Sequence, residues 1–139
     1  MIHLEISRVY DAPPSRVFDA WFSLEWPSFL GPFEIKAELL AFEPKPGGRY
    51  RIVMHRQAGD LVVSGVYRVV ERPSKLAFTW IWDHDPVETL VTLTFRDLGG
   101  RTELVLRHEN FALAERCENH KIGWTSTLEK LDGRLNVPA

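Results

Sequence analysis

The sequence ends in a long amphipathic helix that follows an almost unbroken run of short strands. Between about Ala112 and Leu135, apolar positions recur at steps of three and four residues, so they share one helical face. This stripe consists of Cys117, His120, Trp124, Leu128, Leu131 and Leu135. Such a helix is about 36 Å long, enough to cross a small domain. A sheet that covers it must curl around it, and incomplete packing between the two would leave a pocket.

Size and composition narrow the class of protein. A chain of 139 residues without a linker predicts a single domain over residues 1–139. The single cysteine excludes an internal disulfide and a zinc site built on paired cysteines. The N-terminus lacks a signal-peptide pattern, and no apolar run approaches the roughly 20 residues of a membrane span, so we expect a cytoplasmic protein. A net charge of −2 with interspersed signs argues against nucleic-acid binding.

Alternation of polar and apolar residues predicts about seven antiparallel strands. Residues 2–10 form the first, and two short helical segments follow, one behind Pro14 and the other leading to Gly31. The remaining strands are expected at Glu34–Phe42, Arg49–Arg56, Leu61–Glu71, Lys75–Trp82, Glu88–Arg96 and Thr102–Glu109. Turn residues join them, most clearly in the Leu98–Arg101 hairpin. Without alternating strands and helices, the fold class is α+β rather than a parallel sheet.

The same alternation divides the strands into two faces. The apolar set, which must meet the helix, is Tyr50, Ile52, Met54, Phe78, Trp80, Trp82, Leu104, Leu106 and His108. The solvated set is Arg49, Arg51, His55, Lys75, Thr79, Glu103, Arg107 and Glu109. The strand Leu61–Glu71 is apolar on both sides, and we favour the register in which Tyr67 faces inward.

Six ordered segments, covering nearly the whole chain, resemble one known family. They read RVYDAPPSRVFDAWF, KPGGRYRIVM, VSGVYRVVERPSKLAFTW, VTLTF, LVLRHENF and GWTSTLEKL. Together they resemble the START/SRPBCC superfamily, within it the branch related to the activator of heat-shock-protein-90 ATPase. The resemblance implies a helix-grip fold, in which a curved antiparallel sheet wraps around the C-terminal helix and two short helices close one end. It also implies a cavity for lipids, polyketides, hormones or other apolar molecules.

The sequence departs from the family pattern at one point. Members often have paired tryptophans before a Gly-Pro pair, whereas here Phe29 and Leu30 precede Gly31, and Trp26 lies upstream. We expect this to alter the pocket mouth, so the ligands of relatives do not transfer. The eukaryotic activators carry an additional N-terminal domain without a counterpart in this sequence, so a chaperone partner ranks below a small apolar molecule. The sequence leaves homodimerisation open.

Aromatic residues on the inner face are the main candidates for the pocket lining, because large rings commonly line small-molecule sites. The predicted ligand-binding set is Trp21, Phe29, Met54, Tyr67, Trp80, Trp82, His108, His120 and Trp124. The alternative is that these rings simply fill the core. Gly123 costs a helix around 1 kcal/mol relative to alanine, which indicates close approach or room beside Trp124.

The residues favour binding over catalysis. His108 and His120 could orient a ligand, although a core histidine with a hydrogen-bond partner is the commoner case. Cys117 has nucleophile–base spacing to His120, but nothing supplies an orienting third group or an oxyanion hole. The segment Asp83–Asp85 is interpreted as a hairpin turn rather than a cation site, and we expect no metal or cofactor. A cofactor-free cyclase, dehydratase or hydrolase acting on an aromatic or polyketide-like substrate, and an ATPase-stimulating co-chaperone, are the alternatives.

Overall fold

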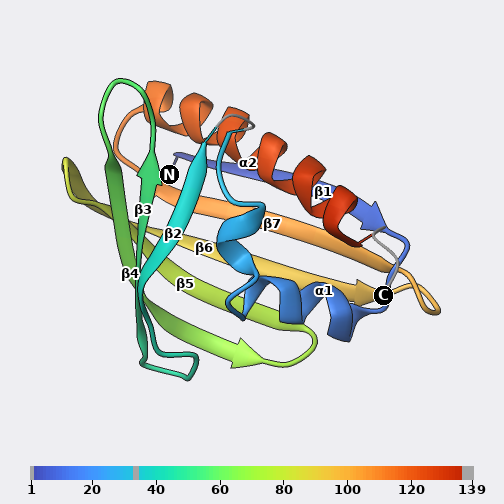
Figure 1. Cartoon of the computed structure of the whole chain (residues 1–139). Coiled ribbons are helices and arrows are strands. Elements are labelled where there is room, and N and C mark those ends of the chain that lie inside the picture. Colours follow the sequence, from blue (N-terminus) through green and yellow to red (C-terminus); the bar gives the residue numbers. More distant parts are fainter. Residues whose placement is uncertain (1, 33–34, 136–139) are drawn as a thin grey trace.

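The computed structural model describes residues 2–32 and 35–135 and contains one antiparallel sheet of seven strands (Figure 1). Their order across the sheet is β1-β7-β6-β5-β4-β3-β2. The strands are β1 (Ile2–Tyr10), β2 (Lys36–Phe42), β3 (Arg49–His55), β4 (Leu61–Glu71), β5 (Lys75–Trp82), β6 (Asp85–Asp97) and β7 (Thr102–Phe111). Because nearly all neighbours in the sheet are also neighbours in sequence, short hairpins build most of it.

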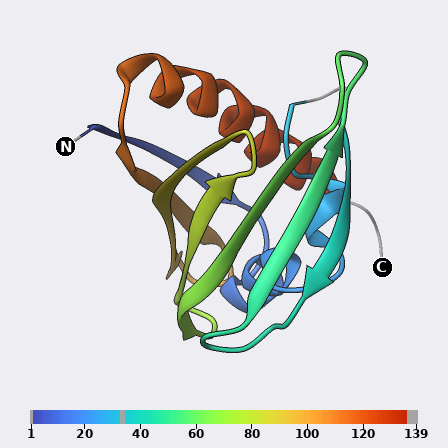
Figure 2. The same cartoon turned by 90° about the vertical axis from the view of Figure 1, so that its left-hand side faces the viewer.

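The long helix α2 (Ala114–Leu135) crosses the concave side of the curved sheet and packs mainly on β1 and β7 (Figures 1 and 2). The Tyr10 hydroxyl donates a 2.7 Å hydrogen bond to the carbonyl of Leu128, and Arg8 pairs with Asp132 at 3.0 Å. These contacts hold the C-terminal half of α2 against β1. The predicted helix-grip arrangement is confirmed.

Two short segments follow β1, as predicted. Helix α1 (Pro14–Trp21) begins at a proline, whose missing N–H is no loss in a first turn. The second, η1 (Trp26–Ser28), is a single 3₁₀ turn rather than an α-helix. Figure 2 shows α1 inside the curve of the sheet, at the end away from the start of α2. No helix among the described residues is both long and apolar enough to span a membrane.

Interlocking rings fill the interior near α1 and η1. Trp26 is fully buried and packs edge-on against Tyr50 and Phe78, with ring centroids 5.1 and 5.3 Å apart. Tyr67 lies in the same cluster, 5.6 Å from Tyr50, which confirms the inward register chosen for its strand. This end is therefore solid core.

The observed boundaries differ from the predicted ones mainly at one side of the sheet. β6 begins at Asp85 rather than Glu88, β7 continues to Phe111, and α2 begins at Ala114 rather than Ala112. The predicted solvent exposure of Thr79 is wrong, because it is 3% exposed and its hydroxyl accepts the backbone N–H of Val66. The β-bulge in β4 between Tyr67 and Val69 interrupts the regular alternation beside this position. The predicted start of β2 at Glu34 falls outside the described residues.

Candidate functional site

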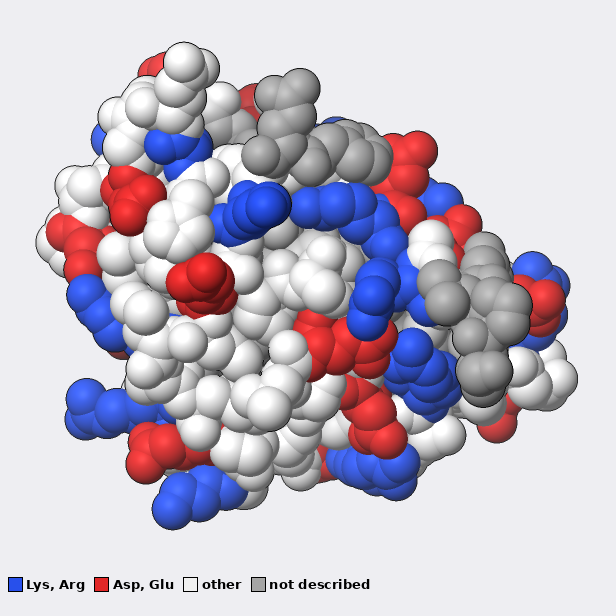
Figure 3. Space-filling model, viewed as in Figure 1, with Lys and Arg blue, Asp and Glu red and all other residues white. Residues whose placement is uncertain are grey.

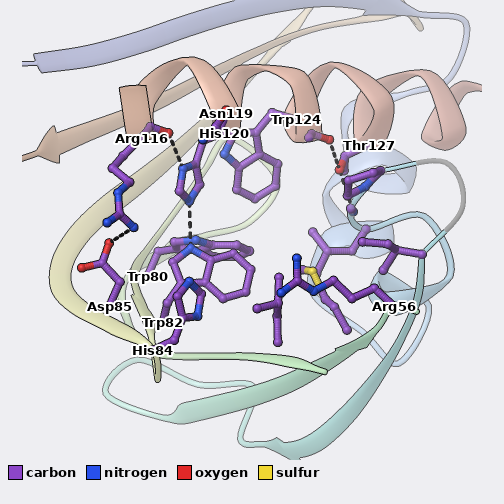
Figure 4. A pocket seen from close by; sticks show the side chains of 17 residues that line it. Arg56, Trp80, Trp82, His84, Asp85, Arg116, Asn119, His120, Trp124 and Thr127 are labelled. Carbon is purple, nitrogen blue, oxygen red and sulfur yellow. Dashed lines mark hydrogen bonds and ion pairs between the residues drawn. The ribbon is translucent and has the colours of Figure 1, made fainter. Parts of the chain in front are cut away.

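A cavity of about 310 Å³ separates the first half of α2 from the adjacent end of the sheet (Figure 4). Helix α2 contributes Arg116, Asn119, His120, Gly123, Trp124 and Thr127. The segment after η1 contributes Leu30, Gly31, Pro32 and Ile35, and the strand ends contribute Met54, Arg56, Leu61, Trp80, Trp82, His84 and Asp85. The pocket therefore lies where α2 and the β3–β6 hairpins diverge.

Three indole rings form one wall of the cavity. The ring centroids of Trp80 and Trp124 are 4.9 Å apart, and Trp82 meets Trp80 edge-on at 5.4 Å. Met54, Leu61 and the segment after η1 add aliphatic surface, so most of the lining is apolar. Such walls favour an apolar body in the interior, with polar contacts confined to the rim.

His108 lies behind this wall and fixes the position of Trp124. The Trp124 indole N–H donates to His108 Nδ1 at 2.9 Å, so the imidazole is neutral and carries its proton on Nε2. That Nε2–H donates to the Thr89 hydroxyl at 2.7 Å, and the hydroxyl donates to the carbonyl of Trp80 at 2.8 Å. Burial, reinforced by nearby His120, lowers the pKa of His108 well below its ordinary value.

His120 repeats this arrangement at the cavity wall. Its Nε2 accepts the indole N–H of Trp82 at 2.8 Å, and its Nδ1–H donates to the carbonyl of Arg116 at 2.7 Å (Figure 4). Burial lowers the pKa of His120 below its ordinary value. Each histidine thus holds one tryptophan of the wall through one ring nitrogen, and its other ring nitrogen is hydrogen-bonded as well.

The rim of the cavity carries the charged groups. Arg116 pairs with Asp85 at 2.6 Å on one side. From the β3–β4 hairpin, Arg56 extends toward the middle of the pocket (Figure 4). Its Nε donates to the carbonyl of Gly59 at 2.8 Å, and no carboxylate among the described residues lies within ion-pair distance. Elsewhere on the face in Figure 3, acidic and basic side chains are interspersed.

The opposite lip of the pocket, the segment Leu30–Pro32, is tied to α2 by two side chains. The Thr127 hydroxyl accepts the backbone N–H of Gly31 at 2.9 Å and donates to the carbonyl of Gly123 at 2.8 Å. Lys130 donates to the carbonyls of Leu30 and Pro32 at 3.3 and 3.1 Å. Gly31 has a φ of +86°, a conformation that side chains disfavour, so the lip depends on both glycine and these ties.

The structure divides the nine predicted ligand-binding residues into two groups. Met54, Trp80, Trp82, His120 and Trp124 line the cavity. Trp21, Phe29, Tyr67 and His108 do not line it and are buried in the core behind it. At the family departure, Phe29 packs edge-on against Trp21, whereas Leu30 reaches the pocket. Ligand binding by any of the nine stays a prediction.

Cys117 and His120, which the sequence does not favour as a nucleophile–base pair, are not arranged for that chemistry. Burial raises the pKa of the Cys117 thiol, which disfavours the nucleophilic thiolate. Both nitrogens of His120 are occupied, so it cannot act as a base in this arrangement. Within residues 2–32 and 35–135, no group of three or more His, Cys, Asp or Glu side chains is placed to hold a metal ion.

Sequence reasoning missed much of the rim. Arg116 and Thr127 lie on α2 at steps of three and four residues from His120 and Trp124, along one edge of the apolar stripe. Gly123, which the sequence marked as close approach or room beside Trp124, borders the cavity. The spacing of Arg116 and Thr127 was therefore visible in the sequence. Arg56, Leu61, His84 and Asp85 carried no comparable signal, because separate hairpins bring them to the cavity.

A second hollow, of about 570 Å³, lies over β4–β7 on the outer face of the sheet. Its lining mixes charged and polar residues such as Arg68, Lys75 and Glu88 with small apolar ones. None of the described residues that line it is aromatic. It lacks the wall of indole rings that lines the first cavity, which is therefore the candidate binding site.

Comparison with solved structures shows the same fold. Protein CV1439 from Chromobacterium violaceum is 23% identical with a TM-score of 0.91, and the match covers 98% of each chain. The AHSA1 protein from Silicibacter pomeroyi is 28% identical with a TM-score of 0.82, over 96% of this chain and 97% of that one. CalU16 from Micromonospora echinospora is 21% identical with a TM-score of 0.74, over 96% and 76%.

Comparison with curated proteins found no match to the sequence. The family model described as activator of Hsp90 ATPase homolog 1-like protein matches residues 11–136, which run from the end of β1 to the end of α2. The match therefore includes every element that lines the cavity. The chain belongs to the activator of Hsp90 ATPase homolog 1-like family.

Proposed function

We propose that the protein binds a small hydrophobic or amphipathic molecule in the cavity between α2 and the sheet. The observation that carries this proposal is the cavity of about 310 Å³ walled by Trp80, Trp82 and Trp124. Its volume falls at the lower end of the range for small-molecule sites, about 300–1,000 Å³. Burial of apolar ligand surface, about 25 cal/mol per Å² before binding costs, would supply the driving force.

The hydrogen bonds of the wall favour binding by a preformed site. His108 and His120 hold two of the three indole rings in place before any ligand arrives. A preformed wall lowers the ordering cost of binding. Because both histidines have both nitrogens occupied, we assign them to positioning tryptophans rather than to contact with a ligand.

The test compares two glycine substitutions on the same helix. Gly123 borders the cavity, and a Cβ there would meet only Pro32, at 3.9 Å, so Gly123→Leu would place a side chain in the pocket. Gly133→Leu is the matched control, since a Cβ there meets nothing within 4 Å and the residue is exposed. Both changes improve helix propensity, so both variants should fold.

We expect neutral, fluorescent phenylnaphthylamine to bind the wild type and Gly133→Leu equally, and Gly123→Leu at least about tenfold more weakly. Mass spectrometry of a solvent extract of the purified wild type would then look for a retained natural ligand. Equal binding of the probe by all three proteins, or by none of them, would contradict the proposed site.

Catalysis and chaperone binding are not included in the proposal. Turnover by a cyclase, dehydratase or hydrolase would need a group free to move a proton, and the two inner histidines are fully hydrogen-bonded. On the outer face, Arg51 and Arg107 are paired with Asp83 and Glu5, which leaves less free positive charge for a chaperone partner.

A further inference from the structure

We propose that the ligand is an amphipathic anion whose acidic group pairs with Arg56 while its apolar body lies against the indole wall. This inference rests on the proposed function and assigns the chemical class of the ligand. It follows from the distribution of charge around the rim, from the free donors of Arg56 and from the position of that side chain over the pocket.

The rim of the cavity is positively charged. The described residues that line the pocket include two arginines and one aspartate, and Arg116 and Asp85 neutralise each other at 2.6 Å. Among the described residues of the lining, this leaves one guanidinium without a carboxylate partner, that of Arg56. An apolar pocket with one unpaired cation at its rim matches a molecule with an apolar body and a single negative charge.

The donors of Arg56 suit an anion. Its Nε is used by the carbonyl of Gly59 at 2.8 Å, which orients the planar guanidinium. No hydrogen bond to a described residue uses Nη1 or Nη2. Two guanidinium nitrogens can bind carboxylate, sulfonate or phosphate oxygens in a forked geometry that a lysine cannot reproduce.

The position of Arg56 keeps the acidic group of such a ligand apart from its apolar body. It follows the last residue of β3, whereas Met54, two residues earlier, points its side chain into the apolar lining. In Figure 4 the guanidinium reaches from the sheet side toward the space faced by Trp82 and Trp124. A ligand whose acidic group meets Arg56 could therefore extend its body along the tryptophans without burying a charge.

The experiment uses two dyes that share one aromatic scaffold. Anilinonaphthalene sulfonate carries an anionic group, and phenylnaphthylamine is the same ring system without it. We expect Arg56→Gln to weaken binding of the sulfonate about three- to tenfold, because the lost contact is an ion pair near the surface. Binding of the neutral dye should be unchanged.

Arg49→Gln is the matched control, since it removes the same charge from the exposed start of β3. It should change neither affinity. Added salt should weaken binding of the sulfonate to the wild type and have less effect on Arg56→Gln. Circular dichroism checks that both variants are folded.

Competition against bound phenylnaphthylamine separates the sources of the anion. We expect dodecanoate or dodecyl phosphate to displace the dye at a lower concentration than dodecanol does. Whichever of the two acts at the lower concentration identifies the acidic group that the site prefers. If dodecanol competes equally well, or if Arg56→Gln weakens both dyes alike, the anion assignment is wrong although the pocket binds. If neither dye binds the wild type, the proposed function fails with it.

Discussion

Among the residues of the wall, two buried tryptophans differ in a single hydrogen bond. Trp80 and Trp124 both line the cavity and are both 3% exposed. The Trp124 N–H donates to His108, whereas the Trp80 N–H has no hydrogen-bond partner among the described residues. The pair therefore separates the effect of a ring from the effect of its polar group.

We expect Trp124→Phe to lower the free energy of unfolding by about 1–3 kcal/mol more than Trp80→Phe. Both changes shrink a ring, but only the first leaves the buried Nδ1 of His108 without its donor. Urea denaturation of the two variants, followed by circular dichroism, measures the difference. Equal losses would mean that the hydrogen bond from Trp124 to His108 adds nothing to stability.

At the scale of elements, the lip of the pocket is held by α2 rather than by the sheet. Thr127 and Lys130, one turn apart, together bind three backbone groups of the segment Leu30–Pro32. The shape of the mouth therefore depends on how this segment and the helix are joined.

Thr127→Val should destabilise the protein by about 1–2 kcal/mol and weaken binding of phenylnaphthylamine, because it leaves the Gly31 N–H without its acceptor. Thr125→Val is the matched control. Thr125 makes the same hydroxyl bond to the carbonyl four residues earlier but is exposed and does not line the pocket. Thermal denaturation and dye titration give the two readouts. If the two variants behave alike, the tie to Gly31 does not shape the mouth.

For the molecule as a whole, the buried His108 and the half-buried His120 couple stability to pH. In the folded state the pKa of His108 and of His120 lies below its ordinary value near 6.5. The unfolded chain therefore binds more protons below about pH 6.5. The stability that goes with the neutral forms of these two histidines is fully present above that pH. It is lost as the pH falls toward their pKa values in the folded state.

We expect the free energy of unfolding to decrease as the pH falls from about 7.5 to about 5.5. The decrease is at most roughly 1.4 kcal/mol per pH unit for each histidine. His55 acts with the opposite sign, because Asp60 and Glu38 raise its pKa, but it is exposed and its effect is small. His120→Gln should flatten the decrease, and the exposed His3→Gln should not. An unchanged slope in His120→Gln would exclude its part in this coupling. Urea titrations at several pH values test this.

Much of the fold could be predicted from the sequence because the informative patterns are local. The alternation of polar and apolar residues predicts both ends of β4 and of β5 correctly. Gly99 and Gly100, both with positive φ, form the predicted hairpin turn. The bulge beside Thr79 was not predictable, since it depends on how neighbouring strands align. Tyr67 faces inward, as predicted for the strand that is apolar on both faces.

Local patterns in the sequence specify the curved sheet, the long helix across it and an inner face rich in indoles, because periodicity and turn chemistry act over a few residues. Which of those rings border open space depends on how the elements pack in three dimensions. Trp21 and Tyr67 fill the core, while Trp80 and Trp124 face a cavity beside Arg56. The reason is that a void is a property of the distance between elements, set by contacts such as those of α2 with β1, and no local pattern encodes that distance.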